Sequence, residues 1–356
     1  MNLHIFNPGH DIALAFNRAH LTMPHAAQEL RMNLGWLPAL WAEDGDFVYV
    51  DDLAYAQKAS SHFKNRIAQV RFVESEALSR LFVNKILPWG WDVTLVAELN
   101  KYNVRSFLMP TRKELNQIRE LSNRRFTTRL LPLIRQDMES QTCGEAYYLE
   151  SIEQCADALS RFKNVVFKAP WSSSGRGIRF VNQITSHPSP SPSTAGWLAN
   201  TIRLQGGVMA EPYYLKVKDF GMEFVAEANG KVRYCGLSLF ETSNQAYTGN
   251  ILASEDEKRR MLSHYIPACL LEALIERLCT VLSAELNKCY KGPLGVDMMV
   301  VARNDGKGFL VHPCVEVNLR RTMGHVALSL TPLPHEWTQK MQILYDTNYR
   351  LKISRL

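Results

Sequence analysis

The sequence lacks the features that would direct a chain out of the cell or into a membrane. Its seven cysteines are odd in number and include no Cys-x-x-Cys pair, which favours a reduced cytoplasmic protein with buried thiols. The N-terminus, MNLHIFNPGHDIALAF, has no cationic start and is interrupted by polar residues, so we expect no signal peptide. No stretch approaches about 18 uninterrupted apolar residues, so we expect no membrane span.

Long runs of one charge are also missing. Lys and Arg exceed Asp and Glu by six in 356 residues, and no cluster of like charges forms an arm for nucleic acid. A positive pocket for an anionic small molecule explains this mild excess equally well. The 46% hydrophobic and 21% charged residues are typical of a globular protein, and the length suggests two or three subdomains. We therefore expect small-molecule partners and no nucleic acid.

Several familiar catalytic and nucleotide-binding motifs are absent. No GxxxxGK[ST] loop occurs, and Gly175-Arg176-Gly177 lacks the third glycine of a dinucleotide fingerprint. We also find no convincing Ser/His/Asp or Cys/His arrangement for a covalent nucleophile.

The segment 295–324 reads as a hairpin. The apolar runs GVDMMVVARN and KGFLVHPCVEVNLR flank Asp305-Gly306, a strong turn signal. With these two residues at the centre of the turn, Asp297 falls opposite Cys314. The two-residue period places on one face Asp297, Cys314, Glu316 and Asn318. It places on the other face Val296, Met298, Val300, Val311, Val315 and Val317.

The polar face of this hairpin suggests a metal site. Two carboxylates and an amide in diagonal positions, about 7–8 Å apart at the backbone, can converge on Mg²⁺. Two alternatives stay open. The acids can be solvated strand edges, or a transition metal can lie at His312, Cys314 and Glu316, although their tight spacing makes a tetrahedral site awkward.

A second informative stretch is NVVFKAPWSSSGRGIRFV, residues 164–181. A buried strand ends in Lys168, and a small flexible loop, 172–177, leads into a returning strand. One cation and several backbone N–H groups can surround a polyphosphate there. An ordinary Ser/Gly hairpin is the alternative.

Residues 1–105 predict a small α/β unit. LHIF and FVYVDD read as strands, and a helical stretch follows to about Leu81. His10 and Asp11 lie at a strand-turn-helix junction, where a doubly wound sheet binds its ligand, although a helix cap with a turn histidine explains them too. PWGWD, residues 88–92, reads as packing under a loop.

The remaining elements follow from pattern. We expect helices at 111–134, 195–205, 255–290 and 335–350, and polar loops at 186–194 and 242–250. Strands are expected at 207–215 and, as a meander, from Asp219 to Phe240. The cluster Arg124, Arg125 and Arg129 is either a solvated face or a phosphate contact.

Together these segments resemble the ATP-grasp superfamily. The ordered set is Lys168, the Ser/Gly loop, Ala210-Glu211-Pro212-Tyr213, Asp219, Asp297 and Glu316-x-Asn318-x-Arg320. The resemblance covers about Ser106 to Leu330 and implies a mixed α+β and α/β fold, in which two α+β subdomains clasp ATP after a Rossmann-like domain. The implied domains are 1–105 (pre-ATP-grasp), 106–212 (helical region and lid), 213–335 (metal-binding subdomain) and 336–356 (C-terminal helix).

The resemblance also implies roles. Lys168 would hold the α and β phosphates, and the loop would close over them with Ser173, Ser174, Gly175, Arg176 and Gly177. Ala210, Glu211 and Tyr213 would meet the adenine, Asp219 the ribose, and Arg125, or Arg124 instead, a phosphate. Asp297, Glu316 and Asn318 would hold one or two Mg²⁺ ions, or Mn²⁺. Arg320 would steady the transferring phosphoryl group, and the substrate contacts would include His10, Asp11, Arg321 and His325.

The implied activity is an ADP-forming ligation in which ATP activates a carboxylate as an acyl phosphate and an amine attacks it. A phosphotransferase and a catalytically silent nucleotide-binding protein are the alternatives. The sequence does not identify the carboxylate or the acceptor, and a homodimer stays open.

Overall fold

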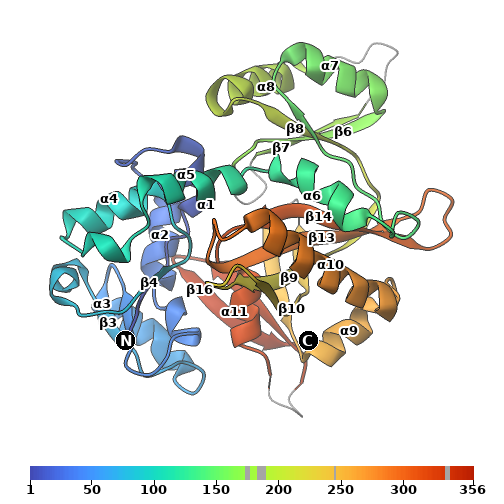
Figure 1. Cartoon of the computed structure of the whole chain (residues 1–356). Helices are drawn as coiled ribbons and strands as arrows, with labels where there is room; N and C mark the ends of the chain where they lie inside the picture. The colour runs from blue at the N-terminus through green and yellow to red at the C-terminus, as the bar shows by residue number, and fades with distance from the viewer. Residues whose placement is uncertain (173–176, 183–189, 244–245, 333–336) are drawn as a thin grey trace.

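The structure, a computed structural model, describes residues 1–172, 177–182, 190–243, 246–332 and 337–356. Each of the four sheets that it contains has four strands (Figure 1). Among these residues no helix is both long enough and apolar enough to cross a membrane.

The first sheet is parallel and has the order β3-β2-β1-β4. Its strands are β1 (Leu3–Ile5), β2 (Phe47–Tyr49), β3 (Arg71–Val73) and β4 (Ile86–Pro88). The helices of this part are α1 (His10–Phe16), α2 (His25–Leu34), α3 (Leu53–Ser60) and α4 (Val93–Lys101). Asp52 and Asp92 cap α3 and α4 by accepting a backbone N–H. This is the expected Rossmann-like unit, but the predicted helix to Leu81 is wrong because β3 and two short 3-10 turns occupy its second half.

Two helices connect this unit to the rest. The predicted helix 111–134 is in fact α5 (Arg112–Leu121) and α6 (Phe126–Arg135). Thr111 and Glu114 form the capping box that begins α5. The helix ends where Asn123 Oδ1 accepts the Arg125 N–H, because this side-chain bond competes with helical hydrogen bonding.

A small antiparallel sheet lies at the top of Figure 1, in the region where a lid is predicted, and we call this part the lid. It has the order β5-β8-β6-β7, with β5 (Tyr147–Leu149), β6 (Asn164–Lys168), β7 (Ile178–Asn182) and β8 (Val208–Pro212). Helices α7 (Ile152–Arg161) and α8 (Pro192–Gln205) share a core with β6 and β8 that includes Leu159, Phe167 and Leu198. Residues 186–189 of the predicted loop 186–194 lie outside the described residues, and its last three residues begin α8 because Ser191 caps that helix.

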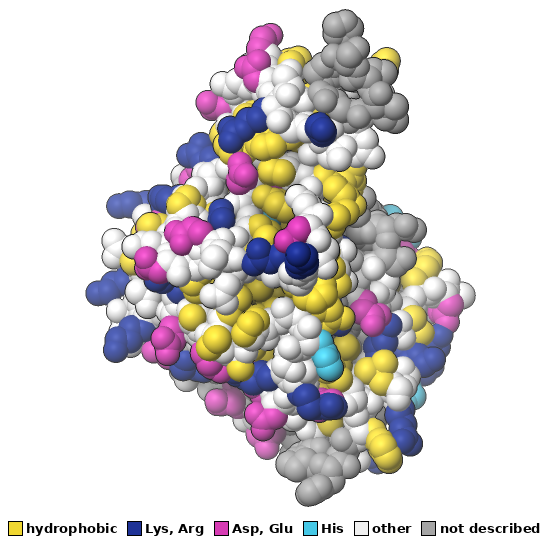
Figure 2. All heavy atoms as spheres, turned by 90° about the vertical axis from the view of Figure 1, so that its right-hand side faces the viewer, with side chains coloured by type: hydrophobic (Ala, Val, Ile, Leu, Met, Phe, Trp, Pro, Cys, Tyr) yellow, Lys and Arg dark blue, Asp and Glu magenta, His cyan; other side chains and the backbone are white. Residues whose placement is uncertain are grey.

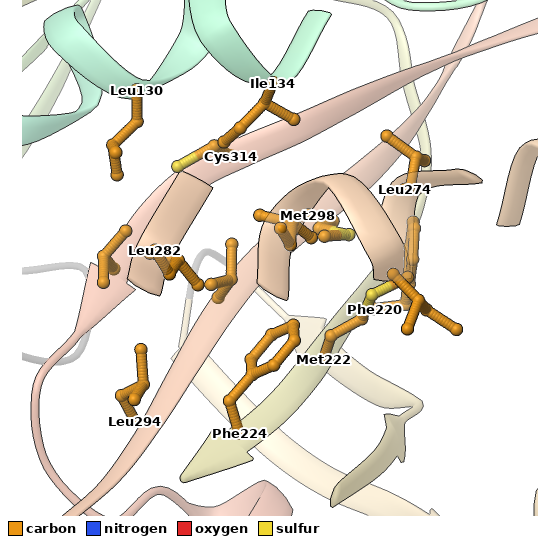
Figure 3. Packing of buried hydrophobic residues seen from close by; sticks show 14 of the residues in the cluster. Leu130, Ile134, Phe220, Met222, Phe224, Leu274, Leu282, Leu294, Met298 and Cys314 are labelled. Atoms are coloured by element: carbon orange, nitrogen blue, oxygen red, sulfur yellow. The ribbon is translucent and has the colours of Figure 1, made fainter. Parts of the chain in front are cut away.

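The main core lies under the third sheet, β10-β9-β13-β14. Its strands are β9 (Lys216–Ala226), β10 (Val232–Ser238), β13 (Gly292–Ala302) and β14 (Phe309–Asn318). Side chains of α6 and α10 (Ala268–Leu286) pack on this sheet, as Leu130, Leu274 and Met298 illustrate (Figure 3). The single helix predicted over 255–290 is wrong: α9 (Glu255–Leu262) ends early, and Pro267 precedes α10 because proline fits the start of a helix and not its interior.

The fourth sheet corrects the prediction for the C-terminus. Its order is β11-β12-β15-β16, with β11 (Phe240–Ser243), β12 (Ala246–Leu252), β15 (Gln339–Tyr345) and β16 (Tyr349–Arg355). The predicted C-terminal helix, 336–356, is therefore wrong, and so is the polar loop at 242–250. Alternate residues of each strand, Met341 and Ile343 on β15 and Tyr349, Leu351 and Ile353 on β16, pack into a core shared with Leu34, Trp36 and α11 (Met323–Ser329). This contact joins the C-terminal hairpin to the first unit.

The surface carries charges of both signs. The face in Figure 2 shows Lys, Arg, Asp and Glu side chains interspersed around a band of hydrophobic side chains. All seven cysteines are free, and the expectation of buried thiols holds for Cys143, Cys155 and Cys314, whereas Cys235 and Cys269 are exposed.

Candidate active site

The hairpin of β13 and β14 forms as predicted near its turn and differs further along. Val300 faces Val311, which is the predicted register, but Asp297 faces Glu316 and not Cys314. A β-bulge causes the change. The paired residues on either side of it are Asp297 with Glu316 and Met299 with His312. Met298 alone lies between these pairs on β13, whereas three residues lie between them on β14. Cys314 consequently joins the hydrophobic core near Ile134 and leaves the polar face (Figure 3). The two carboxylates become direct neighbours.

Asp297, Glu316 and Asn318 form a set of oxygen donors. Asn318 Nδ2 donates to Asp297 Oδ2 over 3.1 Å. Burial, then the charges of Glu316 and Glu223, raise the pKa of Asp297 to about 7. Crowded carboxylates of this kind fit a hard divalent cation, which would relieve their repulsion. By contrast, no group of three or more His, Cys, Asp or Glu within the described ranges could hold a metal, so the alternative site at His312, Cys314 and Glu316 is wrong.

Arg124, and not Arg125, reaches these carboxylates. Its Nη2 lies 2.8 Å from Glu316, and its Nη1 donates to Ala169 O at 2.7 Å and to Ser172 Oγ at 2.6 Å. The break between α5 and α6 positions this side chain, which is 6% exposed. The Arg125 side chain is 53% exposed and lies over the Tyr148 ring, so the structure does not bring it to the carboxylates.

Arg320 follows β14 and forms a bidentate ion pair with Asp11 of α1. Nε and Nη2 donate to the two carboxylate oxygens at 2.8 Å each. Burial would raise the pKa of Asp11, but the charge and hydrogen bonds of Arg320 hold it below its usual value. The pair fastens the first unit to the hairpin.

A small hollow lies where these groups meet. Its lining includes His10, Asp11, Ser172, Glu316, Asn318 and Arg320. The structure therefore brings together two predicted substrate contacts, two predicted metal ligands and the predicted catalytic arginine. We call this hollow the cleft.

The predicted nucleotide contacts lie on the lid and on β9. Lys168 Nζ and Glu211 Oε2, at the ends of β6 and β8, form a buried pair at 2.6 Å. Ala210 is fully buried in the lid sheet, and Tyr213 is 46% exposed beside Phe180. Asp219 accepts hydrogen bonds from Lys216 and Thr242 at 2.6 Å each.

The loop residues are only partly described. Ser173, Ser174, Gly175 and Arg176 lie outside the described residues. Gly177 follows them, and a Cβ there would come within 2.3 Å of Ser172 Oγ, so only glycine fits without a shift.

Two predicted substrate contacts do not line the cleft. His325 is buried, with Nδ1 2.9 Å from Glu223 and Nε2 3.2 Å from Phe224 O. The Arg321 guanidinium lies 4.4 Å from the Trp41 ring centroid, and burial lowers its pKa to about 10.

Sequence reasoning missed Asp92, whose Oδ2 lies 3.1 Å from His10 Nδ1. Its signal was available, because Asp92 follows a short apolar run, now β4, just as His10 follows β1. Parallel strands bring the residues after their carboxyl ends together. It also missed Glu223, which faces Gly295 on β13 and has no distinguishing pattern.

Comparison with known proteins identifies the fold. No family model matches the chain, and no curated protein sequence does. Among solved structures, biotin carboxylase from Campylobacter jejuni, as a beta-gamma-ATP complex, matches with a TM-score of 0.52 at 13% identity, covering 96% of this chain and 75% of that one. N5-carboxyaminoimidazole synthetase from Staphylococcus aureus, complexed with ADP, gives 0.47 at 14%, covering 96% and 82%. A protein from Archaeoglobus fulgidus assigned to the ATP-grasp superfamily gives 0.45 at 12%, covering 100% and 99%. Of these three matches, the Campylobacter structure alone has a TM-score above 0.5, and at 13% identity it shows the fold alone.

Proposed function

Because the chain has the ATP-grasp fold that its sequence predicts, we propose that it is an ATP-dependent, ADP-forming ligase. It activates a carboxylate as an acyl phosphate, and an amine then attacks the activated carbon. The pairing of Asp297 with Glu316 across the hairpin carries the proposal, because it makes a cation site at the edge of a cleft that Arg320 also lines.

Asp297, Glu316 and Asn318 would hold one or two Mg²⁺ ions, with Mn²⁺ an acceptable substitute. Bound there, the metal neutralises negative charge on the phosphates of ATP. Asp297 must lose its proton before it binds the metal. Arg124 fixes the direction of the Glu316 carboxylate through their ion pair at 2.8 Å.

The lid and β9 would bind the rest of the nucleotide. We assign Lys168 to the α and β phosphates, with Glu211 orienting its ammonium group at 2.6 Å. Asp219 takes the ribose, and the backbone around Glu211 and Tyr213 takes the adenine. The loop over the phosphates comprises Ser173, Ser174, Gly175, Arg176 and Gly177, and Arg124 replaces Arg125 as the phosphate contact.

Arg320 would stabilise the transferring phosphoryl group. Its two bonds to Asp11 fix the guanidinium plane before any substrate binds, and phosphoryl transfer depends on such positioning and charge neutralisation. Arg320 then supplies a cation to a cleft that must accept both phosphate and carboxylate, and Arg124 lies beside this cleft, bonded to the lining residues Ser172 and Glu316.

Hydroxylamine trapping tests the proposal, because hydroxylamine converts an acyl phosphate into a stable hydroxamate. Purified protein is incubated with ATP, Mg²⁺, hydroxylamine and a panel of carboxylates, and ADP and hydroxamate are measured together. We expect equal amounts of both with at least one carboxylate. Asp297→Asn should lower the rate about 10²-fold or more. Asp305→Asn makes the same change at the exposed turn of the same hairpin and should not.

The outcomes separate the candidate activities. A stable phosphorylated product without hydroxamate would identify a phosphotransferase. No carboxylate-dependent ADP, together with no nucleotide binding, would contradict both enzymatic readings.

A further inference from the structure

A second hollow, with a volume of about 370 Å³, opens in the first unit. It lies at the carboxyl ends of β1, β2 and β4, where its lining includes Asn7, Tyr49, Asp51 and Asp92. In the strand order β3-β2-β1-β4, β2 and β3 follow β1 on one side of it, whereas the next strand, β4, lies on its other side. The direction of strand addition therefore reverses next to β1. A crevice at such a reversal is where open parallel sheets bind ligands. We call this hollow the acceptor pocket.

The charges of the acceptor pocket favour a cation. Asp51, Asp92 and Glu98 line it against one guanidinium, that of Arg31. Glu98 already holds Arg31 with two hydrogen bonds of 2.8 and 2.6 Å. Asp51 lies 3.3 Å from the same group, and burial raises its pKa. The uncompensated negative charge suits an ammonium group and disfavours a second carboxylate.

His10 connects the two hollows. It is the one described residue that lines both the cleft and the acceptor pocket, and it is 1% exposed. Its Nδ1 faces Asp92 Oδ2 at 3.1 Å, while its Nε2 has no hydrogen-bond partner among the described residues.

Asp92 determines which ring nitrogen of His10 carries the proton. Its Oδ1 accepts the Leu95 N–H at the start of α4 over 2.9 Å, and its Oδ2 accepts from Asn7 at 3.2 Å. A carboxylate held in this way keeps the proton of His10 on Nδ1, so Nε2 presents a lone pair.

We propose that the acceptor pocket binds the amine substrate as its ammonium ion and that Nε2 of His10 takes a proton from it. This inference rests on the proposed ligase activity. The ammonium nitrogen gives one proton to Nε2 and becomes a nucleophile. The nitrogen attacks the carbonyl carbon of the acyl phosphate, and the C–N bond forms. The C–O bond to phosphate breaks, its electron pair leaves with the phosphate, and the phosphate takes the second proton.

The test uses the carboxylate that yields hydroxamate and compares the reaction rates with two different acceptors. One acceptor is hydroxylamine, which is uncharged at neutral pH and needs no base. The other is the amine fraction that a sulfonate resin retains from a deproteinised cell extract. His10→Asn keeps an N–H for Asp92 and removes Nε2. The ratio of the rate with the amine fraction to the rate with hydroxylamine should fall about 10²-fold or more in this variant.

His4→Gln is the matched control. His4 is also buried and pairs with an aspartate, Asp46, at 2.9 Å, but it lines neither hollow. His4→Gln should leave the rates with hydroxylamine and with the amine fraction unchanged. Asp51→Asn should raise the concentration of the amine fraction needed for half-maximal rate about ten-fold.

Each other result overturns the inference. Equal loss of both rates in His10→Asn would make His10 structural, and loss of neither would remove its role. Hydroxamate formation without any turnover of the amine fraction would exclude an amine acceptor while leaving carboxylate activation intact. Absence of hydroxamate in the wild type would contradict the proposed function itself.

Discussion

The pKa of the Asp297 carboxyl group links stability to the metal site at the scale of single residues. Its pKa in the folded protein is about 7, well above the ordinary value of 3.8, because of burial and then the charges of Glu316 and Glu223. The folded state therefore binds a proton between pH 4 and 7 that the unfolded state has lost. Protonated Asp297 favours folding below about pH 4, and this contribution disappears as the pH rises through 7.

The metal-free protein should consequently lose stability between pH 5 and pH 7. One group can contribute up to about 1.4 kcal/mol per pH unit over this range. Urea unfolding in EDTA at both pH values measures the difference. Asp297→Asn should reduce it and Asp305→Asn should not; an unchanged difference in Asp297→Asn would contradict the assignment.

The pair of Asp11 and Arg320 is the second prediction at this scale. Asp11→Ala would leave the Arg320 charge without its partner in a largely buried site, at a cost of about 3 kcal/mol in unfolding free energy. Glu285→Gln removes one partner of a more exposed pair with Arg129 and should cost about 1 kcal/mol or less. Equal effects in urea unfolding would show that the Asp11 pair is not buried in solution.

At the scale of elements, the C-terminal hairpin carries a prediction of its own. Met341 on β15 is fully buried in the core that joins this hairpin to Leu34 and Trp36. Met341→Ala should therefore destabilise the protein by about 2–5 kcal/mol. Lys352→Ala on the exposed side of β16 should change stability by no more than about 0.5 kcal/mol. Denaturant unfolding of both variants tests whether the hairpin is part of the cooperative core.

The elements also show what a sequence can predict. The Asp305-Gly306 turn gave the hairpin and its register near the turn, because turn type and strand period are local. The bulge beside Met298 depends on packing around Cys314 and could not be read from period alone. The C-terminal strands were mistaken for a helix because their burial depends on residues of the first unit such as Leu34 and Trp36, more than 300 residues earlier in the sequence.

The residues of the candidate site also fall into those that local pattern predicts and those that only the tertiary structure brings together. Residues on one hairpin, such as Asp297 and Glu316, were predicted together because one turn relates them. Arg124 and Asp92 come from other elements, and only the folded chain brings them to Glu316 and His10.

At the scale of the whole molecule, the cleft draws its lining from three parts of the chain. His10 and Asp11 come from the first unit, Ser172 from the end of the lid strands, and Glu316 to Arg320 from the hairpin and the residues after it. A nucleotide and a metal bound there would contact all three parts. Their binding should therefore stabilise the protein as a whole.

The most direct test is the melting temperature with Mg²⁺ alone, ATP alone and both together. A ligand at 100 times its dissociation constant stabilises the folded state by about 2.7 kcal/mol, which is a shift of several degrees. We predict a shift that requires both components, disappears in Asp297→Asn and persists in Asp305→Asn. No shift under any condition, or one that Asp297→Asn retains in full, would contradict a magnesium nucleotide site on this hairpin.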